Sequence, residues 1–542
     1  MATTEPKANF TNPITPARAG RREWIGLAVL MLPTLLIVMD LTVLHLALPH
    51  LSADLKPSST QMLWIVDIYG FMIAGSLITM GTLGDRIGRR RLLLIGAGAF
   101  GVASVIAAFS TSAGMLIAAR ALLGIAGATL MPSTMSLIRN MFLDPRQRTV
   151  AIGIWVSGFS VGSAIGPLLG GLLLEHFWWG SVFLLGVPVM VLLLIAGPLL
   201  LPEYKDPNPG HFDLISAGLS LVGMLSVIYG LKQIAQNGVA WLPILFIVAG
   251  LSLGVIFVRR QRTLADPLID LRLFRVPAFS TSLITYTFGI FFAFGSFLFI
   301  AQYMQLVLGL SPLQAGLWTV PGAIASIIGS NIAPRLVRRV RPAFVIGGGL
   351  ALATVGLGLL TQASVNSLAV VVIGWVAMSL GFGMTFTLTA DLVVGTAPPE
   401  RAGAASALSE TGAEFGGALG LAVLGSIGIA IYRSQVAATL PAGIPPEAAA
   451  AARETLAGAV AAAGQLPDQL GAALLNSAHL AFVHALQLVA LVGVVGFIGL
   501  TILAPVLLRD VLIHAEPEDH PEKAHAVPNV TARPLHDAQV GD

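Results

Sequence analysis

Cysteine is absent from the 542-residue chain, and its ten histidines form neither an HxxxH nor an HExxH pattern. Disulfides, thiol catalysis and cysteine-ligated metals are therefore excluded. The chain also lacks a GxxxxGK[ST] phosphate-binding loop, so direct use of ATP has no support. We accordingly expect no metal, no organic cofactor and no enzymatic reaction.

Charged residues are scarce as well. They make up 11% of the chain, whereas 56% is hydrophobic and the mean hydropathy is +0.85. One soluble core cannot bury so much apolar surface, so the lipid bilayer is the expected partner. No cleavable signal is evident: residues 1–23 are polar, and the apolar run that follows is too long for a signal segment. The first helix therefore stays in the mature protein.

Apolar runs of about 18 to 25 residues are long enough to cross a bilayer as helices. The sequence contains fourteen such runs, at 24–48, 62–83, 92–110, 115–137, 150–173, 181–201, 213–232, 240–259, 278–308, 313–333, 343–362, 367–392, 402–431 and 480–508. The predicted fold class is an all-α membrane protein with fourteen transmembrane helices.

The basic residues indicate the orientation, because Lys and Arg accumulate on the cytoplasmic side of a membrane. With both termini inside, only Lys56, Lys232, Arg433 and Arg453 of the 30 Lys and Arg fall outside, and Arg120 falls within a span. The basic excess therefore reflects topology, and we expect no binding to nucleic acid.

Short matches indicate an internal repeat. LWIV at 63–66 recurs as LWTV at 317–320, and other matches follow in the same order. We infer two homologous six-helix halves around an inserted helix pair, an arrangement typical of transporters with a central site and alternating access. The predicted segments are a cytoplasmic tail at 1–23, a first bundle at 24–202, an inserted pair at 213–259, a second bundle at 278–508 with a partly helical outer loop at 433–479, and a disordered cytoplasmic tail at 509–542.

Two acids and one base interrupt the apolar spans of the first bundle. Asp40 lies in LIVMDLTVL, Asp67 in LWIVDIY, and Arg120 five residues into the fourth span. A charge in hydrocarbon costs about 2.5 to 3.5 kcal/mol on insertion scales, so each of them needs a partner. At a rise of about 1.5 Å per residue the three lie at one depth, and we expect a buried cluster. The alternative is a static pair between Arg120 and one acid, which leaves the other acid unpaired.

An unpaired, partly desolvated carboxyl group binds a proton near neutral pH and attracts an organic cation when it is deprotonated. Competition between a proton and a cation for one carboxylate is the simplest chemistry of an antiporter. Helix thirteen adds Glu410 and Glu414, which share one helical face in a glycine-lined span. For Glu410 a solvated position near the inner end remains an alternative. Asp391 is expected to be a solvated helix terminus.

Aromatic side chains are candidates for lining a cavity, because their faces attract ammonium groups. We single out Tyr69, Trp155 and Phe386. Aromatic belts at the membrane interface are the competing explanation for such residues.

Glycine patterns mark two segments expected to control conformation. Residues 81–91 read GTLGDRIGRRR, in which Asp85 can accept hydrogen bonds from a helix N-terminus or from an arginine as a breakable lock. Residues 162–171 read GSAIGPLLGG, a smooth glycine face beside a bending proline. A plain anchoring loop and simple close packing are the alternatives. The residues concerned are Gly81, Gly84, Asp85, Arg86, Gly88, Arg89, Gly162, Gly166, Pro167 and Gly170.

Over nearly its whole length the sequence resembles the fourteen-helix drug:proton antiporters of the major facilitator superfamily. The motifs that carry the resemblance are the loop at 81–91, RALLGIAGA at 120–128, GSAIGPLLGG at 162–171, MPST at 131–134 and DLRLF at 270–274. The resemblance implies a monomeric multidrug exporter of the bacterial cytoplasmic membrane that exchanges lipophilic, dye-like or quaternary ammonium cations for protons.

The same resemblance implies roles in proton coupling or cation recognition for Asp40, Asp67 and Glu410, with Glu414 in place of an aspartate. Some relatives that tolerate bivalent cations carry an acid in the tenth span, where this chain has Ser326. Monovalent lipophilic cations are therefore the expected cargo. Two other functions remain open, which are proton-coupled export of an endogenous lipid or metabolite and a non-transporting membrane receptor or scaffold. The buried acids argue against the scaffold.

Overall fold

The computed structural model describes residues 18–57, 59–205, 213–264, 267–398 and 401–509, and within these ranges the regular structure is entirely helical. Fourteen of its helical segments are long and apolar enough to cross a membrane, and they match the predicted spans one for one. The predicted fold class is therefore confirmed. The tails before residue 18 and after residue 509 lie outside the described residues.

The first half comprises six spans, the last of which is formed by two consecutive helices. Its helices are α1 (Arg21–Leu55), α2 (Ser59–Ile87), α3 (Arg89–Ala108), α4 (Ala113–Met141), α5 (Pro145–His176), α6 (Ser181–Leu184) and α7 (Gly186–Leu200). The inserted pair consists of α8 (Leu214–Asn237) and α9 (Trp241–Thr263). A short 3-10 helix, η1 (Leu271–Arg275), leads into the second half.

The second half again contains six spans. Its helices are α10 (Pro277–Gln302), the π-helical turn η2 (Tyr303–Val307), α11 (Pro312–Leu336), α12 (Pro342–Leu360), α13 (Leu368–Thr396), α14 (Ala402–Thr439), α15 (Pro446–Glu454), α16 (Leu456–Ala463) and α17 (Asp468–Leu508). The predicted outer loop is mostly helical, because α14 and α17 extend into it and α15 and α16 fill the remainder. The Tyr432 hydroxyl donates to the Ala452 carbonyl at 2.9 Å and ties α14 to α15.

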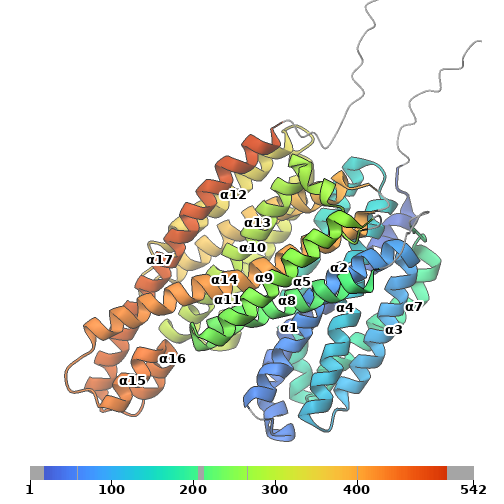
Figure 1. Ribbon diagram of the computed structural model, residues 1–542. Helices are drawn as coiled ribbons and strands as arrows, with labels where there is room; N and C mark the ends of the chain where they lie inside the picture. Colours follow the sequence, from blue (N-terminus) through green and yellow to red (C-terminus); the bar gives the residue numbers. More distant parts are fainter. Residues whose placement is uncertain (1–17, 58, 206–212, 265–266, 399–400, 510–542) are drawn as a thin grey trace, which may run out of the picture.

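Each half has its own apolar core, and the inserted pair lies against both halves. One large cluster of buried side chains is formed almost entirely within the first half and another within the second half. Helix α8 packs on α9, on α2 and on α14, and Figure 1 shows the green pair running between the blue and the orange helices. The start of α1 and the end of α17 lie on one side of the molecule, which we call the terminal side, and the halves diverge toward the opposite side (Figure 1).

The glycine face of α5 brings that helix close to α1. A Cβ atom at Gly162 would lie 2.9 Å from the Leu35 carbonyl oxygen, and one at Gly170 would lie 2.7 Å from a Val43 methyl group. Gly166 is buried on the same helix, and the Pro167 side chain lies outside the described residues. Close packing, the simpler of the two predictions for this motif, accounts for these contacts.

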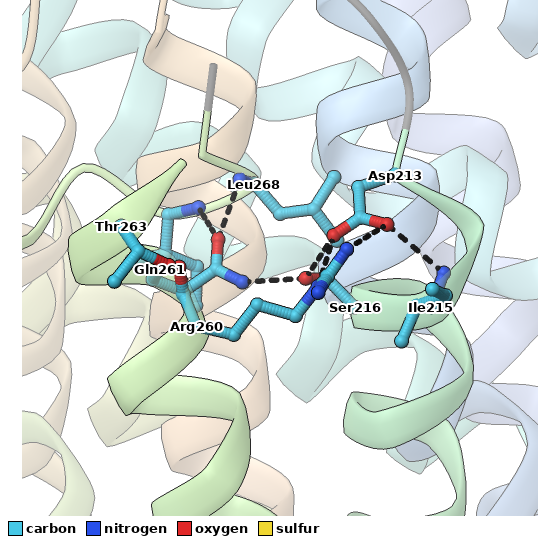
Figure 2. A network of polar contacts seen from close by, with 8 residues as sticks. Asp213, Ile215, Ser216, Arg260, Gln261, Thr263 and Leu268 are labelled. Carbon is cyan, nitrogen blue, oxygen red and sulfur yellow. Dashed lines mark hydrogen bonds and ion pairs between the residues drawn. The ribbon is translucent and has the colours of Figure 1, made fainter. Parts of the chain in front are cut away.

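A polar network joins the terminal-side ends of the inserted pair (Figure 2). Asp213 caps α8, and the Arg260 guanidinium of α9 donates to both of its carboxylate oxygens, at 2.6 and 3.1 Å. The Gln261 amide donates to the Ser216 hydroxyl at 2.8 Å and accepts from the Leu268 backbone amide at 2.7 Å. The two helices are therefore fixed to one another and to the segment that leads into the second half.

The hydrogen bonds from Arg260 hold the pKa of Asp213 well below its usual range. A carboxyl group with a lowered pKa stabilises the fold fully above its unfolded value of about 4 and loses that contribution as the pH falls. We therefore expect Asp213→Asn to lower the melting temperature by the same few degrees at all pH values from weakly acidic to weakly alkaline, and by less in strong acid. Melting curves in detergent across that range check this. A difference that changes steadily through neutral pH would contradict it.

Candidate functional site

Asp40 and Arg120 form an ion pair inside the first half. Arg120 of α4 donates from Nη1 to Asp40 Oδ2 of α1 at 3.2 Å, and the two side chains are 0% and 12% exposed. The Tyr69 ring lies 5.0 Å and the Phe183 ring 5.9 Å from the centre of the guanidinium group. Aromatic faces stabilise the buried cation without supplying a second negative charge. The predicted contact between Asp40 and Arg120 is present.

This pair leaves several buried polar atoms without partners. Within the described ranges, Arg120 Nε, Arg120 Nη2, the Tyr69 hydroxyl and Trp155 Nε1 make no hydrogen bond. An unsatisfied buried donor costs about 1 to 3 kcal/mol, so a water or ligand group that accepts a hydrogen bond from these atoms is favoured. Asp40 also borders a recess of about 10 Å³, which is room for about one water molecule.

Asp67 does not join this cluster, so the prediction of a three-residue group is wrong. Its carboxylate forms an ion pair with Lys232 of α8. The prediction assigned Lys232 to the outer side, but α8 continues to Asn237 and places this lysine within the span, beside α2. Asp67 and Arg120 lie at one depth but are not in contact. The inserted helix α8 instead places Lys232 beside Asp67 on a different face of α2.

Glu410 and Glu414 lie on α14, and neither forms a salt bridge in the part of the chain that the structure describes. Glu410 is 4% exposed, which excludes the solvated position that was its alternative, while Glu414 is half-buried. Tyr286 of α10 lies within electrostatic range of both carboxyl groups. Two acids one turn apart thus lie on one face of α14, with no salt bridge to either among the described residues.

Tyr69 connects the acids of the two halves. It is 0% exposed, and its hydroxyl lies within electrostatic range of both Asp40 and Glu414. The Asp40 pair of the first half and the glutamate pair of the second half therefore approach one region from opposite sides. This juxtaposition requires the tertiary fold, because more than 370 positions separate Asp40 from Glu414.

The other aromatic candidates occupy the same interior. Phe386 of α13 stacks on Phe382 with ring centroids 5.3 Å apart and meets Tyr286 edge-on at 5.2 Å. It packs against the cores of both halves. Trp155 of α5 is 1% exposed and meets Phe159 edge-on at 5.0 Å. Both are interior residues rather than members of an interfacial belt.

Asp85 connects the two halves on the terminal side. Its Oδ1 accepts from Arg89 Nε at 2.7 Å, and its Oδ2 accepts from the Ala404 backbone amide at the start of α14 at 3.1 Å. Both partners expected from the sequence, an arginine and a helix N-terminus, are therefore present. Arg89, which is 0% exposed, also donates to the Gly81 carbonyl.

The glycines of this segment leave room for Arg89. A Cβ atom at Gly403 would lie 1.0 Å from Arg89 Nη2, and one at Gly84 would lie 2.5 Å from Nη1. Gly81 approaches Gly403 across the two halves, where a Cβ would lie 2.8 Å from the carbonyl oxygen. Gly88 has a φ of 113°, a conformation that favours glycine. Arg86, by contrast, is only half-buried.

A second connection corrects the expectation for Asp391. This residue is 1% exposed rather than solvated, and it accepts from Arg148 Nε at 2.8 Å and from the Thr149 hydroxyl at 2.6 Å. Asp391 lies on α13 and its donors lie on α5, so the bond crosses from one half to the other. The signal available in the sequence was an acid inside an apolar run, which we interpreted by depth alone.

Two weaker contacts continue this connection inward between α5 and α11. The Asn331 amide donates to the Ser157 hydroxyl at 2.9 Å, and the Ser160 hydroxyl donates to Ser326 at 3.0 Å. These two bonds lie between the middle of α5 and α11 and their terminal-side ends. Together with the contacts of Asp85 and Asp391, we call them the terminal-side closure.

Two pseudo-symmetric helical bundles that enclose buried acids, and meet on one side only, define a membrane transporter. The chain belongs to the Major Facilitator Superfamily, whose profile matches residues 30–421. It is thus a transporter and not an enzyme.

Several named proteins are similar to the chain along most of its length. It is 47% identical to the multidrug efflux pump LfrA of Mycolicibacterium smegmatis, with 86% of this chain and 92% of the relative covered. It is 35% identical to the methyl viologen resistance protein SmvA of Salmonella typhimurium, covering 85% and 93%. It is 31% identical to the tetracenomycin C resistance and export protein of Streptomyces glaucescens, covering 96% and 97%.

Solved structures agree on the fold. The human organic anion transporter MFSD10 matches with a TM-score of 0.59 at 15% identity, covering 88% of this chain and 99% of that one. The proton:xylose symporter XylE matches with a TM-score of 0.51 at 18% identity, covering 74% and 87%.

Proposed function

We propose that the chain is a multidrug efflux transporter that exports monovalent lipophilic cations in exchange for protons. The observation that carries the proposal is the Asp40–Arg120 pair, a buried ion pair with unsatisfied donors that lies opposite two unpaired glutamates. The similarity to the multidrug efflux pump LfrA and to the methyl viologen resistance protein SmvA supports drug efflux.

In this mechanism the Asp40 carboxylate has three alternative partners: the Arg120 guanidinium, a proton and the cargo cation. A proton or a cation that binds Asp40 removes the negative charge that Arg120 needs. Arg120 is wholly buried, so its positive charge is then left without a negative partner. The energetic cost of this unpaired buried charge favours a rearrangement of the helices. Glu410 and Glu414 supply further proton or cation sites from the second half.

We assign the terminal side to the cytoplasm, because most Lys and Arg are expected there. The terminal-side closure then seals the cytoplasmic end, and the conformation described is the one open toward the outside. The protein is proposed to act as a monomer in the bacterial cytoplasmic membrane.

The cargo class follows from the number of carboxylates free to bind it. Asp67 is occupied by Lys232, and Ser326 supplies a hydroxyl rather than a carboxylate between α5 and α11. Ethidium-type dyes and quaternary ammonium compounds with one charge and aromatic surface suit a site with few free acids and interior aromatics. Export of an endogenous metabolite is a second candidate, favoured by the similarity to the tetracenomycin C export protein along 96% of the chain.

Proteoliposomes with an acidic lumen test the proposed function. Lumenal DNA reports ethidium entry by fluorescence, and valinomycin with potassium clamps the membrane potential. We expect uptake that starts with the pH gradient and stops when nigericin collapses it. Ethidium movement that is indifferent to the gradient would contradict proton coupling, and gradient-driven movement of a neutral metabolite instead of the dye would favour the second candidate.

The two glutamates are expected to differ. Glu410→Gln should lower the gradient-driven rate about tenfold and leave dye binding within about twofold, because so deeply buried a carboxyl group admits a proton more readily than a bulky cation. Glu414→Gln should weaken dye binding about tenfold, because its half-buried charge is available to cargo. Initial rates and binding titrations separate the two effects.

Glu447→Gln, on the exposed surface of α15, is the matched control and should change neither quantity. Equal effects of both glutamates on binding would contradict the division of roles.

A further inference from the structure

The inserted pair contributes a cation to the transport machinery. Lys232 of α8 pairs with Asp67 of α2, and its Nζ lies 4.8 Å from the centroid of the Phe71 ring. The two charged side chains are 30% and 16% exposed, so neither is fully enclosed by the protein. The Lys232 ammonium also lies within electrostatic range of Glu414 on α14. One lysine therefore acts on an acid of each half.

Further aromatic rings pack beside Phe71, the ring that Lys232 contacts. Trp64 meets Phe71 edge-on with centroids 6.1 Å apart, and it stacks on Tyr229 of α8 at 6.1 Å with nearly parallel planes. A carboxylate beside aromatic faces is the chemistry that binds organic ammonium groups. Trp64 is 37% exposed, so this group of residues is not fully enclosed by the protein. Lys232 thus occupies what is otherwise a site for an organic cation.

The ion pair is not needed to hold α8 in place. Apolar clusters already fix this part of the helix, one formed with α2 through Phe71, Ala74 and Ile228, and one formed with α14 through Val227, Leu231 and Ala422. The ion pair neutralises an acid that is costly to leave unpaired within a span, but it is not the only attachment of α8. A partly exposed lysine thus lies beside the carboxylate and the aromatic rings that would otherwise bind an organic cation. This placement points to a role in ligand selection.

We propose that Lys232 is a tethered competitor that keeps Asp67 from binding cargo and thereby restricts the transporter to monovalent cations. The inference rests on the proposed function. A cation with one charge binds without Asp67, whereas a dication needs a second free carboxylate. The Asp67–Lys232 pair is neutral, and the lysine also opposes a second positive charge near Glu414.

Binding titrations on the purified chain in detergent test this, because they need no proton gradient. Tetraphenylphosphonium serves as the monovalent probe and methyl viologen as the bivalent one, each followed by intrinsic tryptophan fluorescence. For Lys232→Gln we expect the ratio of the bivalent to the monovalent dissociation constant to fall about tenfold or more, because one carboxylate becomes free. Lys232→Arg should keep the wild-type ratio.

Arg433→Gln, which removes an exposed cation near the end of α14 that does not contact Asp67, is the matched control for net charge. An unchanged ratio in Lys232→Gln, or an equal fall in Arg433→Gln, overturns the inference. Lys232→Met repeats the comparison if the glutamine variant does not fold. If the ratio of dissociation constants falls in Lys232→Gln as expected but the protein shows no gradient-driven transport, only the proposed function is contradicted. If the wild-type protein binds neither probe, both the proposed function and the inference are overturned.

Discussion

Asp40→Asn is expected to abolish proton-driven ethidium transport, with a fall in initial rate of about 100-fold or more. The substitution removes the negative partner of Arg120, which is 0% exposed. Breaking a buried ion pair by removing one member costs about 3 to 5 kcal/mol, because the remaining charge is left uncompensated. The amide also can neither take up a proton in the physiological range nor attract a cation. Initial rates in proteoliposomes measure the effect.

Two further variants separate loss of mechanism from loss of folding. The double variant Asp40→Asn, Arg120→Gln removes the uncompensated charge, so we expect it to recover thermal stability without recovering transport. Asp54→Asn lies at the far end of the same helix, where the carboxylate accepts from Trp179 Nε1 at 2.9 Å, and should transport normally. Transport that returns in the double variant would show that Asp40 acts only by neutralising Arg120.

Gly403→Ala is expected to open the terminal-side closure. The added Cβ would lie 1.0 Å from Arg89 Nη2, so the guanidinium must leave its position beside Asp85. In a helix, alanine is otherwise more favourable than glycine by about 1 kcal/mol. Helix propensity alone would therefore stabilise the start of α14, and a loss of the closure would have to come from the clash with Arg89. We expect a shift toward the conformation open on the terminal side and a fall in transport of about tenfold.

The absence of cysteine makes this shift measurable with introduced spin labels. Arg91 and Arg338 are exposed on the terminal side of the first and second halves, and labels at these two positions report their separation. The distance distribution should lengthen in Gly403→Ala. Gly348→Ala, where a Cβ meets nothing within 4 Å, is the matched control. An unchanged distribution in Gly403→Ala would contradict the account of the closure.

Sequence reasoning succeeded where the signal is local or carried by a motif. Hydropathy located the fourteen spans, because a membrane helix must be apolar along its length. The GTLGDRIGRRR motif predicted that Asp85 accepts from a helix N-terminus or from an arginine, and the structure contains both contacts. Depth and the high cost of an unpaired intramembrane charge predicted that Arg120 meets an acid, and of the two acids at that depth it meets Asp40.

Sequence reasoning failed where an ion pair depends on which helix faces are in contact. Asp67 and Arg120 share a depth, yet α8 places Lys232 against Asp67 first. Asp391 was assigned to solvent because it lies near a helix end, but α5 of the other half covers it with Arg148 and Thr149. The depth of a residue in the membrane can be predicted from its position along one helix. The residue that it contacts depends on how helices far apart in the sequence pack together.

The central claim is that a proton and a cation compete for the Asp40 carboxylate. Proton release on cation binding tests it most directly, measured with a pH indicator after tetraphenylphosphonium is added to weakly buffered, purified protein near neutral pH. We predict that wild-type protein releases protons as it binds the cation and that Asp40→Asn releases markedly fewer. Cation binding without proton release in the wild type, or equal release by Asp40→Asn, would contradict the claim.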